Sequence, residues 1–211
     1  MADSAVGQIG QKIGATQSTD KHQTCAIAET LQQAWVPNRP EVTTALDSAL
    51  ILCADHELNV SAFTVRCVAS AGSSLYAAVN AGLSALQGHR HGGQSELVEL
   101  LLKDIELMAS GDATSDMAKS AQRVVANRLK RGENIPGFGQ PLYPDGDPRC
   151  KVLLRMVEEY DADGSTVAVA NAVADFVVGQ VGIQPSLDFG LALLARSCLL
   201  YTSDAADDSG C

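Results

Sequence analysis

The stretch His91-Gly-Gly-Gln-Ser-Glu-Leu-Val-Glu-Leu-Leu-Leu-Lys-Asp-Ile-Glu-Leu-Met108 joins a glycine-rich polar loop to a strongly apolar segment. Apolar residues recur in that segment at spacings of three and four, which is typical of a helix with one buried face. The spacing predicts a helix over 96–108. Its predicted buried stripe consists of Leu97, Leu100, Leu101, Ile105 and Met108.

Helical periodicity continues on both sides of this stretch, and no segment alternates as a strand would. Ser61 and Thr114 are predicted N-caps, because their hydroxyls can accept the first free N–H groups of a helix. The chain is 46% hydrophobic but only 4% aromatic, which favours close packing of small-residue helices. The predicted fold class is all-α, with further helices over 26–35, 40–53, 62–71, 75–86, 115–131, 149–160 and 165–181, and a last helix from Ser186.

The charge and cysteine content exclude several function classes. The net charge of -10 argues against non-specific nucleic-acid binding, although a local cationic pocket still permits small anionic ligands. None of the six cysteines forms a Cys-x-x-Cys pair or a zinc spacing, so we expect no metal. The thiols of Cys53 and Cys67, in apolar helical stretches, are expected to be buried and structural. With no export signal and no apolar run of ~20 residues, the predicted location is cytoplasmic, away from membranes.

Five polar clusters interrupt the helical pattern and concentrate the residues that carry chemistry. Together they supply imidazoles, an arginine and a carboxylate in mostly apolar surroundings. An arginine binds a carboxylate, a carboxylate accepts a proton and an imidazole stabilises an oxyanion, so this mixture suits a small anionic substrate. The clusters are Ala54-Asp-His-Glu-Leu-Asn59, Gly88-His-Arg-His-Gly-Gly93, Gly137-Phe-Gly-Gln-Pro-Leu-Tyr143, Gly146-Asp-Pro-Arg149 and Pro185-Ser-Leu-Asp-Phe189.

In this order the clusters resemble those of the citrate synthase family, over roughly residues 41–196. The resemblance implies a large helical domain and a smaller one, with the substrates in the cleft between them. It also implies a reaction of the tricarboxylic acid cycle, the condensation of acetyl-CoA with oxaloacetate to give citrate and CoA. Acetyl-CoA would then be a co-substrate, with no permanently bound cofactor, and the full-length protein a homodimer.

The family's catalytic pair maps onto Asp188 and His91. Asp188 lies in Pro-Ser-Leu-Asp-Phe, close to the family's Pro-Asn-x-Asp-Phe, whose aspartate removes a methyl proton from acetyl-CoA. An aspartate is also favoured in the first turn of any helix, so this position has a purely structural interpretation too. Asp175, which lacks the preceding proline, is the rival candidate and is interpreted as a helix-surface residue. His91 precedes a Gly-Gly pair and resembles the imidazole that hydrogen-bonds the thioester oxygen, whereas His89 is interpreted as an ordinary loop residue.

The substrate-binding residues follow from the same resemblance. His56 matches a histidine that binds the keto acid, and Arg149 matches an arginine that holds a substrate carboxylate through its planar fork. The loop Ile135-Pro136-Gly137-Phe138-Gly139 resembles the segment that wraps the CoA adenine. Arg196 lies outside these motifs and is interpreted as structural.

Gln140 is the main departure from the family pattern, which has Gly-Phe-Gly-His or Gly-Tyr-Gly-His at this point. The family histidine polarises the keto carbonyl of oxaloacetate. A glutamine amide still donates a hydrogen bond but carries no positive charge and transfers no proton near neutral pH. Citrate synthesis impaired at Gln140 is therefore one hypothesis. A 2-methylcitrate synthase that uses propionyl-CoA and a non-catalytic dicarboxylate-binding homologue are the alternatives.

The predicted domain organisation follows the family. Residues 1–92 are assigned to part of the large domain, 93–184 to the small domain and 185–196 to the return to the large domain. After Arg196 the family pattern ends, and residues 197–211 are interpreted as translated adapter sequence rather than a genuine acidic tail. The chain is expected to be a fragment. The small residues Ala77, Ala78, Ala81 and Gly82 indicate a closely packed helix at the expected dimer interface.

Overall fold

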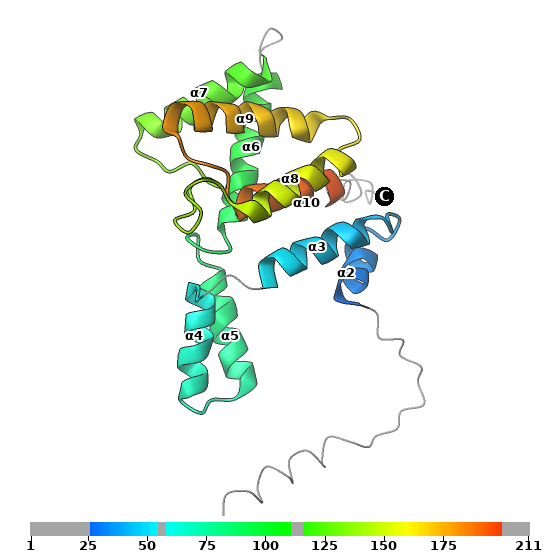
Figure 1. Ribbon diagram of the computed structural model, residues 1–211, viewed down its shortest axis with the longest axis vertical. Helices are drawn as coiled ribbons and strands as arrows, with labels where there is room; N and C mark the ends of the chain where they lie inside the picture. The colour runs from blue at the N-terminus through cyan, green and yellow to red at the C-terminus, as the bar shows by residue number, and fades with distance from the viewer. Residues whose placement is uncertain (1–25, 55–57, 111–115, 200–211) are drawn as a thin grey trace, which may run out of the picture.

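The computed structural model describes residues 26–54, 58–110 and 116–199, and within these ranges the fold is all-α, as predicted. The one β feature among them is an isolated antiparallel bridge between Phe138 and Pro185. The helices are α2 (Ile27–Trp35), α3 (Val42–Ala54), α4 (Val60–Ser70), α5 (Leu75–Leu86), α6 (Gln94–Ser110), α7 (Met117–Lys130), α8 (Pro148–Tyr160), α9 (Ser165–Val181) and α10 (Leu187–Leu199) (Figure 1).

Two predicted N-caps are not observed. Asn59, not Ser61, caps α4, since its Oδ1 accepts the N–H of Ala62 at 2.8 Å. The helix begins before Ser61, which places this serine inside the first turn and frees its hydroxyl for other contacts. Thr114 lies outside the described residues, and Asp116 caps α7.

α6 packs against α7, α9 and α10 and contributes a large part of the core. Its buried stripe is Val98, Leu101, Leu102 and Ile105, whereas Leu100 is 49% exposed. The predicted stripe of Leu97, Leu100, Leu101, Ile105 and Met108 is therefore confirmed at Leu101 and Ile105 and wrong at Leu100, while Met108 is partly buried against the core. A segment with three consecutive leucines fits two neighbouring helical stripes, and only packing against the other helices decides between them.

α8 and α10 lie side by side (Figure 1) and bury Leu153, Val157, Phe189 and Leu193 between the helices of the core. α10 continues through the position where the non-native tail was expected to begin. Ser197 and Cys198 are buried within it, and their carbonyls accept hydrogen bonds from Arg39 at 3.2 and 3.1 Å.

The predicted domain limits at residues 92 and 184 both fall in loops.

α4 and α5 form a hairpin that extends away from the other helices (Figure 1). Gly82 allows their close approach, because a Cβ at this position would lie 2.4 Å from Cγ2 of Val65. The hairpin leaves large apolar side chains of both helices exposed. They are Val60, Phe63, Leu75, Tyr76, Val79, Leu83 and Leu86.

The described cysteines are free thiols that differ in exposure. Cys53 and Cys67 are exposed, which corrects the prediction that both are buried. Each lies in an apolar helix, but their positions on those helices are not covered by the neighbouring helices. Cys150 is buried, and this burial raises its pKa to about 12, so its thiol stays protonated. Among the described helices, none combines the length and the apolar character needed to cross a membrane.

Candidate active site

The N-termini of three helices meet at one place. Ser95, Arg149 and Asp188 are the second residues of α6, α8 and α10 respectively. The Ser95 hydroxyl donates to Oδ1 of Asp188 at 3.0 Å, which joins α6 to α10. The Leu187 N–H donates to Oδ2 of Asp147, the N-cap of α8, at 3.1 Å, which joins α10 to α8. Because helix N-termini carry partial positive charge, this convergence favours an anionic ligand.

Asp188 is half-buried at the centre of this arrangement. Burial raises the pKa of its carboxyl above the usual range, and this effect outweighs the Ser95 hydrogen bond and the nearby charges of Arg149 and His91, which lower it. A carboxylate with a raised pKa is a stronger base than one in water. The carboxyl of Asp188 is therefore a stronger base than that of an aspartate in water.

Arg149 is held by Asp147, two residues earlier in the chain. Its Nε and Nη2 donate to the two carboxylate oxygens of Asp147 at 3.0 and 2.7 Å, and the Arg149 backbone N–H donates to Oδ1 at 3.0 Å. The ring of Tyr143 lies 5.4 Å from the guanidinium carbon, within the range of a cation–π contact. The side chain is therefore fixed on two sides.

One donor of Arg149 is left over. Nη1 is buried and has no hydrogen-bond partner among the described residues. An unpaired buried N–H of a cation is costly, so such a group is expected to bind an anionic oxygen when a ligand is present. Asp147 orients the guanidinium and leaves Nη1 as its unpaired buried donor.

His91 is bound to α4 through a short relay. Its Nε2 lies 2.8 Å from the Ser61 hydroxyl, which in turn donates to Oδ1 of Asn59 at 2.8 Å. The backbone N–H of His91 donates to the Gly88 carbonyl at 2.8 Å, which folds the loop back on itself. The relay fixes the ring plane of His91 through one nitrogen and leaves Nδ1 as the second hydrogen-bonding position.

The loop Ile135–Gly139 packs beside the start of α10. Its Gly137 carbonyl accepts the Ser186 N–H at 2.8 Å, and its Gly139 N–H donates to the Gln184 carbonyl at 2.9 Å. Phe138 contacts Phe189 with ring centroids 4.9 Å apart. The loop thus helps to position α10, and two of its backbone polar groups are already paired within the protein.

Gly137 is required by both its conformation and its surroundings. Its φ of +78° lies in the left-handed region, and a Cβ there would lie 2.6 Å from Val98 Cγ2 and 3.0 Å from Phe189 Cβ. Ile135, Pro136, Gly137 and Phe138 are buried, whereas Gly139 is exposed. A ligand that reaches this loop from solvent would therefore meet it at Gly139.

Gln140 follows the loop and is half-buried. Its backbone carbonyl accepts the Tyr143 N–H at 2.9 Å, and its side-chain Oε1 lies 3.5 Å from the Leu142 N–H, at the limit of a hydrogen bond. When the amide oxygen faces this turn, its nitrogen is the group that can donate to a ligand.

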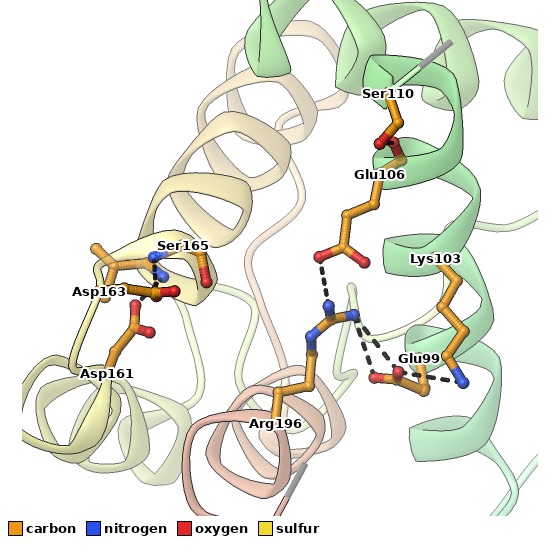
Figure 2. A network of polar contacts seen from close by, with 9 residues as sticks. Glu99, Lys103, Glu106, Ser110, Asp161, Asp163, Ser165 and Arg196 are labelled. Carbon is orange, nitrogen blue, oxygen red and sulfur yellow. Dashed lines mark hydrogen bonds and ion pairs between the residues drawn. The ribbon is translucent and has the colours of Figure 1, made fainter. Parts of the chain in front are cut away.

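Other sequence candidates lie away from this centre or outside the described residues. Asp175 is exposed on α9, and His89 is exposed on the loop before α6. Arg196 on α10 forms ion pairs with Glu99 and Glu106 of α6 (Figure 2), which agrees with a structural role. His56 lies outside the described residues.

Sequence reasoning missed four polar residues of the site. A local pattern could have identified Asp147. Aspartate is favoured at the N-cap and proline at the first position of a helix, so an Asp-Pro pair indicates a helix start. Ser61 was interpreted as a cap, and Asn59 and Ser95 had no assigned role. The contacts of Ser61 with His91 and of Ser95 with Asp188 span 30 and 93 residues, so no local pattern indicates them.

The residues that the structure describes contain no group of three or more His, Cys, Asp or Glu side chains arranged to hold a metal ion.

Comparisons with known proteins point to one family. Residues 5–203 match the family model described as citrate synthase, C-terminal domain. Citrate synthase 2 of Bacillus subtilis is 33% identical over 156 residues, which cover 72% of this chain but 39% of that protein. Citrate synthase of Helicobacter pylori is 41% identical over 122 residues, 57% of this chain and 26% of that protein. The chain thus spans less than two fifths of these relatives.

Solved structures agree with the sequence comparisons. The crystal structure of citrate synthase from Thermotoga maritima is similar with a TM-score of 0.70 and 29% identity, covering 82% of this chain and 46% of that one. Citryl-CoA lyase from Hydrogenobacter thermophilus is similar with a TM-score of 0.63 and 25% identity, covering 83% of this chain and 66% of that one.

Proposed function

The chain belongs to the citrate synthase family, and we propose that it carries the condensing site of an enzyme that joins acetyl-CoA to oxaloacetate. The products are citrate and CoA, in the reaction that feeds acetyl groups into the tricarboxylic acid cycle in the cytoplasm. The observation that carries the proposal is the convergence of Asp188 and Arg149 at the N-termini of α10 and α8, with His91 near enough to lower the pKa of Asp188.

In the proposed first step, Asp188 removes a proton from the methyl carbon of acetyl-CoA. His91 donates a hydrogen bond to the thioester oxygen as negative charge develops there. Its Nε2 is bonded to the Ser61 hydroxyl, which itself donates to Asn59, so Nε2 is a donor and Nδ1 donates to this oxygen as the second N–H of the protonated imidazolium ring. Stabilisation of such an oxyanion by a fixed donor is among the largest contributions to catalysis.

In the second step, the new carbon nucleophile attacks the keto carbon of oxaloacetate and forms the carbon–carbon bond. Arg149 binds a carboxylate of the keto acid through Nη1, and His56 is proposed to bind the same substrate. Gln140 donates its amide hydrogen bond to the keto oxygen, which takes a proton from water and becomes the hydroxyl of citrate. Water then cleaves the thioester carbon–sulfur bond, which releases citrate and CoA.

The loop Ile135–Gly139 is proposed to bind the CoA adenine at its solvent-facing end, where Gly139 is exposed. Acetyl-CoA is thus a co-substrate, and the mechanism uses no permanently bound cofactor. Propionyl-CoA differs by one methylene, which is worth only ~1–3 kcal/mol of discrimination. A 2-methylcitrate synthase therefore remains the alternative enzyme, and a dicarboxylate-binding protein without turnover is the alternative outside catalysis.

We further propose that the full-length protein is a homodimer that pairs through the α4–α5 hairpin. On α5, the exposed residues Leu75, Tyr76, Val79, Leu83 and Leu86 follow helical spacing and make a continuous apolar stripe. A stripe of this kind is typical of a surface that is covered in an assembly.

The test is an assay of the complete protein with acetyl-CoA and oxaloacetate, following CoA release with a thiol reagent. Exchange of the methyl protons of acetyl-CoA with solvent deuterium isolates the first step. We expect both CoA release and methyl-proton exchange with acetyl-CoA. Propionyl-CoA is assayed in parallel as the substrate of the alternative enzyme. Binding of oxaloacetate without exchange or CoA release would contradict the proposed synthase and favour the non-catalytic homologue.

A further inference from the structure

Ser95 makes a contact that its own helix does not require. In this chain the hydroxyls of Ser70, Ser84 and Ser110 donate to carbonyl groups three or four residues earlier in their own helices. This is the usual bond of a serine inside a helix. The Ser95 hydroxyl instead leaves α6 and donates to Oδ1 of Asp188 on α10, at 3.0 Å.

The position of Ser95 makes this contact specific. It is the second residue of α6, four residues after His91, so the same short segment carries both the imidazole and the hydroxyl. Both side chains are half-buried and bound to partners on other helices. A bond to one carboxylate oxygen restricts rotation of the Asp188 side chain and leaves the second oxygen, Oδ2, to accept a proton.

We propose, on the basis of the function proposed above, that Ser95 is a positioning residue of the condensing site that holds Oδ1 of Asp188. Oδ2 then receives the methyl proton of the acyl-CoA. The hydroxyl keeps the carboxylate in one orientation beside His91 and stabilises its charged form, because a donor on a carboxylate favours the ionised state.

The charge balance around Asp188 supports this assignment. Burial raises the pKa of Asp188, and the Ser95 hydrogen bond leads the effects that lower it again. The Ser95 hydrogen bond thus offsets part of the increase in the pKa of Asp188 that burial causes. Among the described residues, the other ionisable groups near Asp188 are His91 before α6, Cys53 of α3, Arg149 and Cys150 of α8, and Asp147, the N-cap of α8.

The experiment compares Ser95→Ala, which removes the hydroxyl, with Ser95→Thr, which keeps it, in the complete protein. Ser110→Ala is the matched control, since it removes a serine hydroxyl from the other end of the same helix, where the bond stays within α6. The Asp188 carboxyl is titrated by carbon-13 NMR, its signal being assigned by its loss in Asp188→Asn. The pH dependence of acetyl-CoA methyl exchange is measured in parallel.

We expect the Asp188 carboxyl of Ser95→Ala to titrate at higher pH than in the parent. At pH values below that range, methyl exchange in Ser95→Ala should be about tenfold slower than in the parent at the same pH. This factor is in line with the loss of one hydrogen bond to a charged group. Ser95→Thr and Ser110→Ala should follow the parent. Ser95→Cys, which keeps the volume but donates weakly, should shift in the same direction as Ser95→Ala.

An unchanged carboxyl titration in Ser95→Ala, or equal shifts in Ser95→Ala and Ser95→Thr, would overturn the inference. The two proposals fail separately. A parent protein without methyl exchange contradicts the proposed function, whereas the NMR titration still decides whether Ser95 controls Asp188.

Discussion

Asp147 and Arg149 form a bidentate ion pair in which the aspartate side chain is fully buried and the arginine side chain is 10% exposed. The same carboxylate also caps α8 and accepts the first N–H of α10. One buried aspartate therefore orients Arg149, the arginine proposed to bind substrate, and joins two of the three helix ends at the candidate site.

Replacement of Asp147 tests the contribution of this aspartate to the stability of the fold. Asp147→Asn preserves the size and the capping oxygen but leaves the Arg149 charge unpaired. Removal of one partner of a buried pair costs about 3–5 kcal/mol, so the free energy of unfolding in urea should fall by about that amount. Glu133→Gln is the control, because it removes the ion pairs of an exposed glutamate with Arg131, at the same two-residue spacing, and with Arg128, and should change stability little. Equal effects of the two variants would contradict a special role for Asp147.

Asp188→Asn tests the proposed base. The amide keeps the shape and accepts the Ser95 hydrogen bond but cannot take a proton. Exchange of acetyl-CoA methyl protons should fall at least ~10²-fold, the low end of the contribution of a general base. Oxaloacetate binding, measured by calorimetry, should stay near the parent value. Asp175→Asn is the control, and loss of exchange in that variant alone would transfer the base role to Asp175.

The same Asp188→Asn variant makes a prediction about stability. Because the pKa of Asp188 is raised in the folded protein, its ionised form destabilises the fold. At pH values above the folded pKa, Asp188→Asn should be more stable than the parent. The difference should disappear as the pH falls through that pKa, since Asp188 is then neutral. Urea unfolding across a pH series measures this, and a difference that grows on acidification would contradict the raised pKa.

Gln140→His tests the departure from the family pattern. If the missing imidazole limits the attack on the keto carbon, kcat for citrate formation should rise by about tenfold, within the range of one oxyanion donor. Gln140→Ala, which removes the amide donor, should lower kcat. A rate that is unchanged or lower in Gln140→His would show a pocket adapted to glutamine, with another keto acid as substrate.

The dimer proposal needs a variant outside the α4–α5 contact itself. Gly82 packs against Val65 within the hairpin, so Gly82→Leu would disturb both the hairpin and any dimer. Val79 is 55% exposed on the apolar stripe, and Val79→Asp should convert the dimer to monomers without unfolding the hairpin. Light scattering measures the mass. Ser84→Asp adds the same charge on a different face of α5 and should leave the dimer intact, whereas a monomeric parent protein would contradict the proposal.

The sequence alone determined the elements that depend on local interactions. Helical period and caps act within one or two turns, so α5 and α9 match the predicted ranges, and α8 begins at the Asp-Pro pair beside its predicted start. The polar clusters also identified the family, because their order along the chain is a linear property. Asp188, His91 and Arg149 were therefore assigned from the sequence with their proposed roles.

The tertiary structure alone decided which residues meet. The contacts of Ser95 with Asp188 and of Ser61 with His91 join distant segments, and the helix periods allow many such pairings. Packing likewise chose the buried stripe of α6, where Leu102 is buried and Leu100 is exposed. Local sequence sets the energy of a turn of helix, but burial and hydrogen bonding between helices depend on the simultaneous placement of all of them.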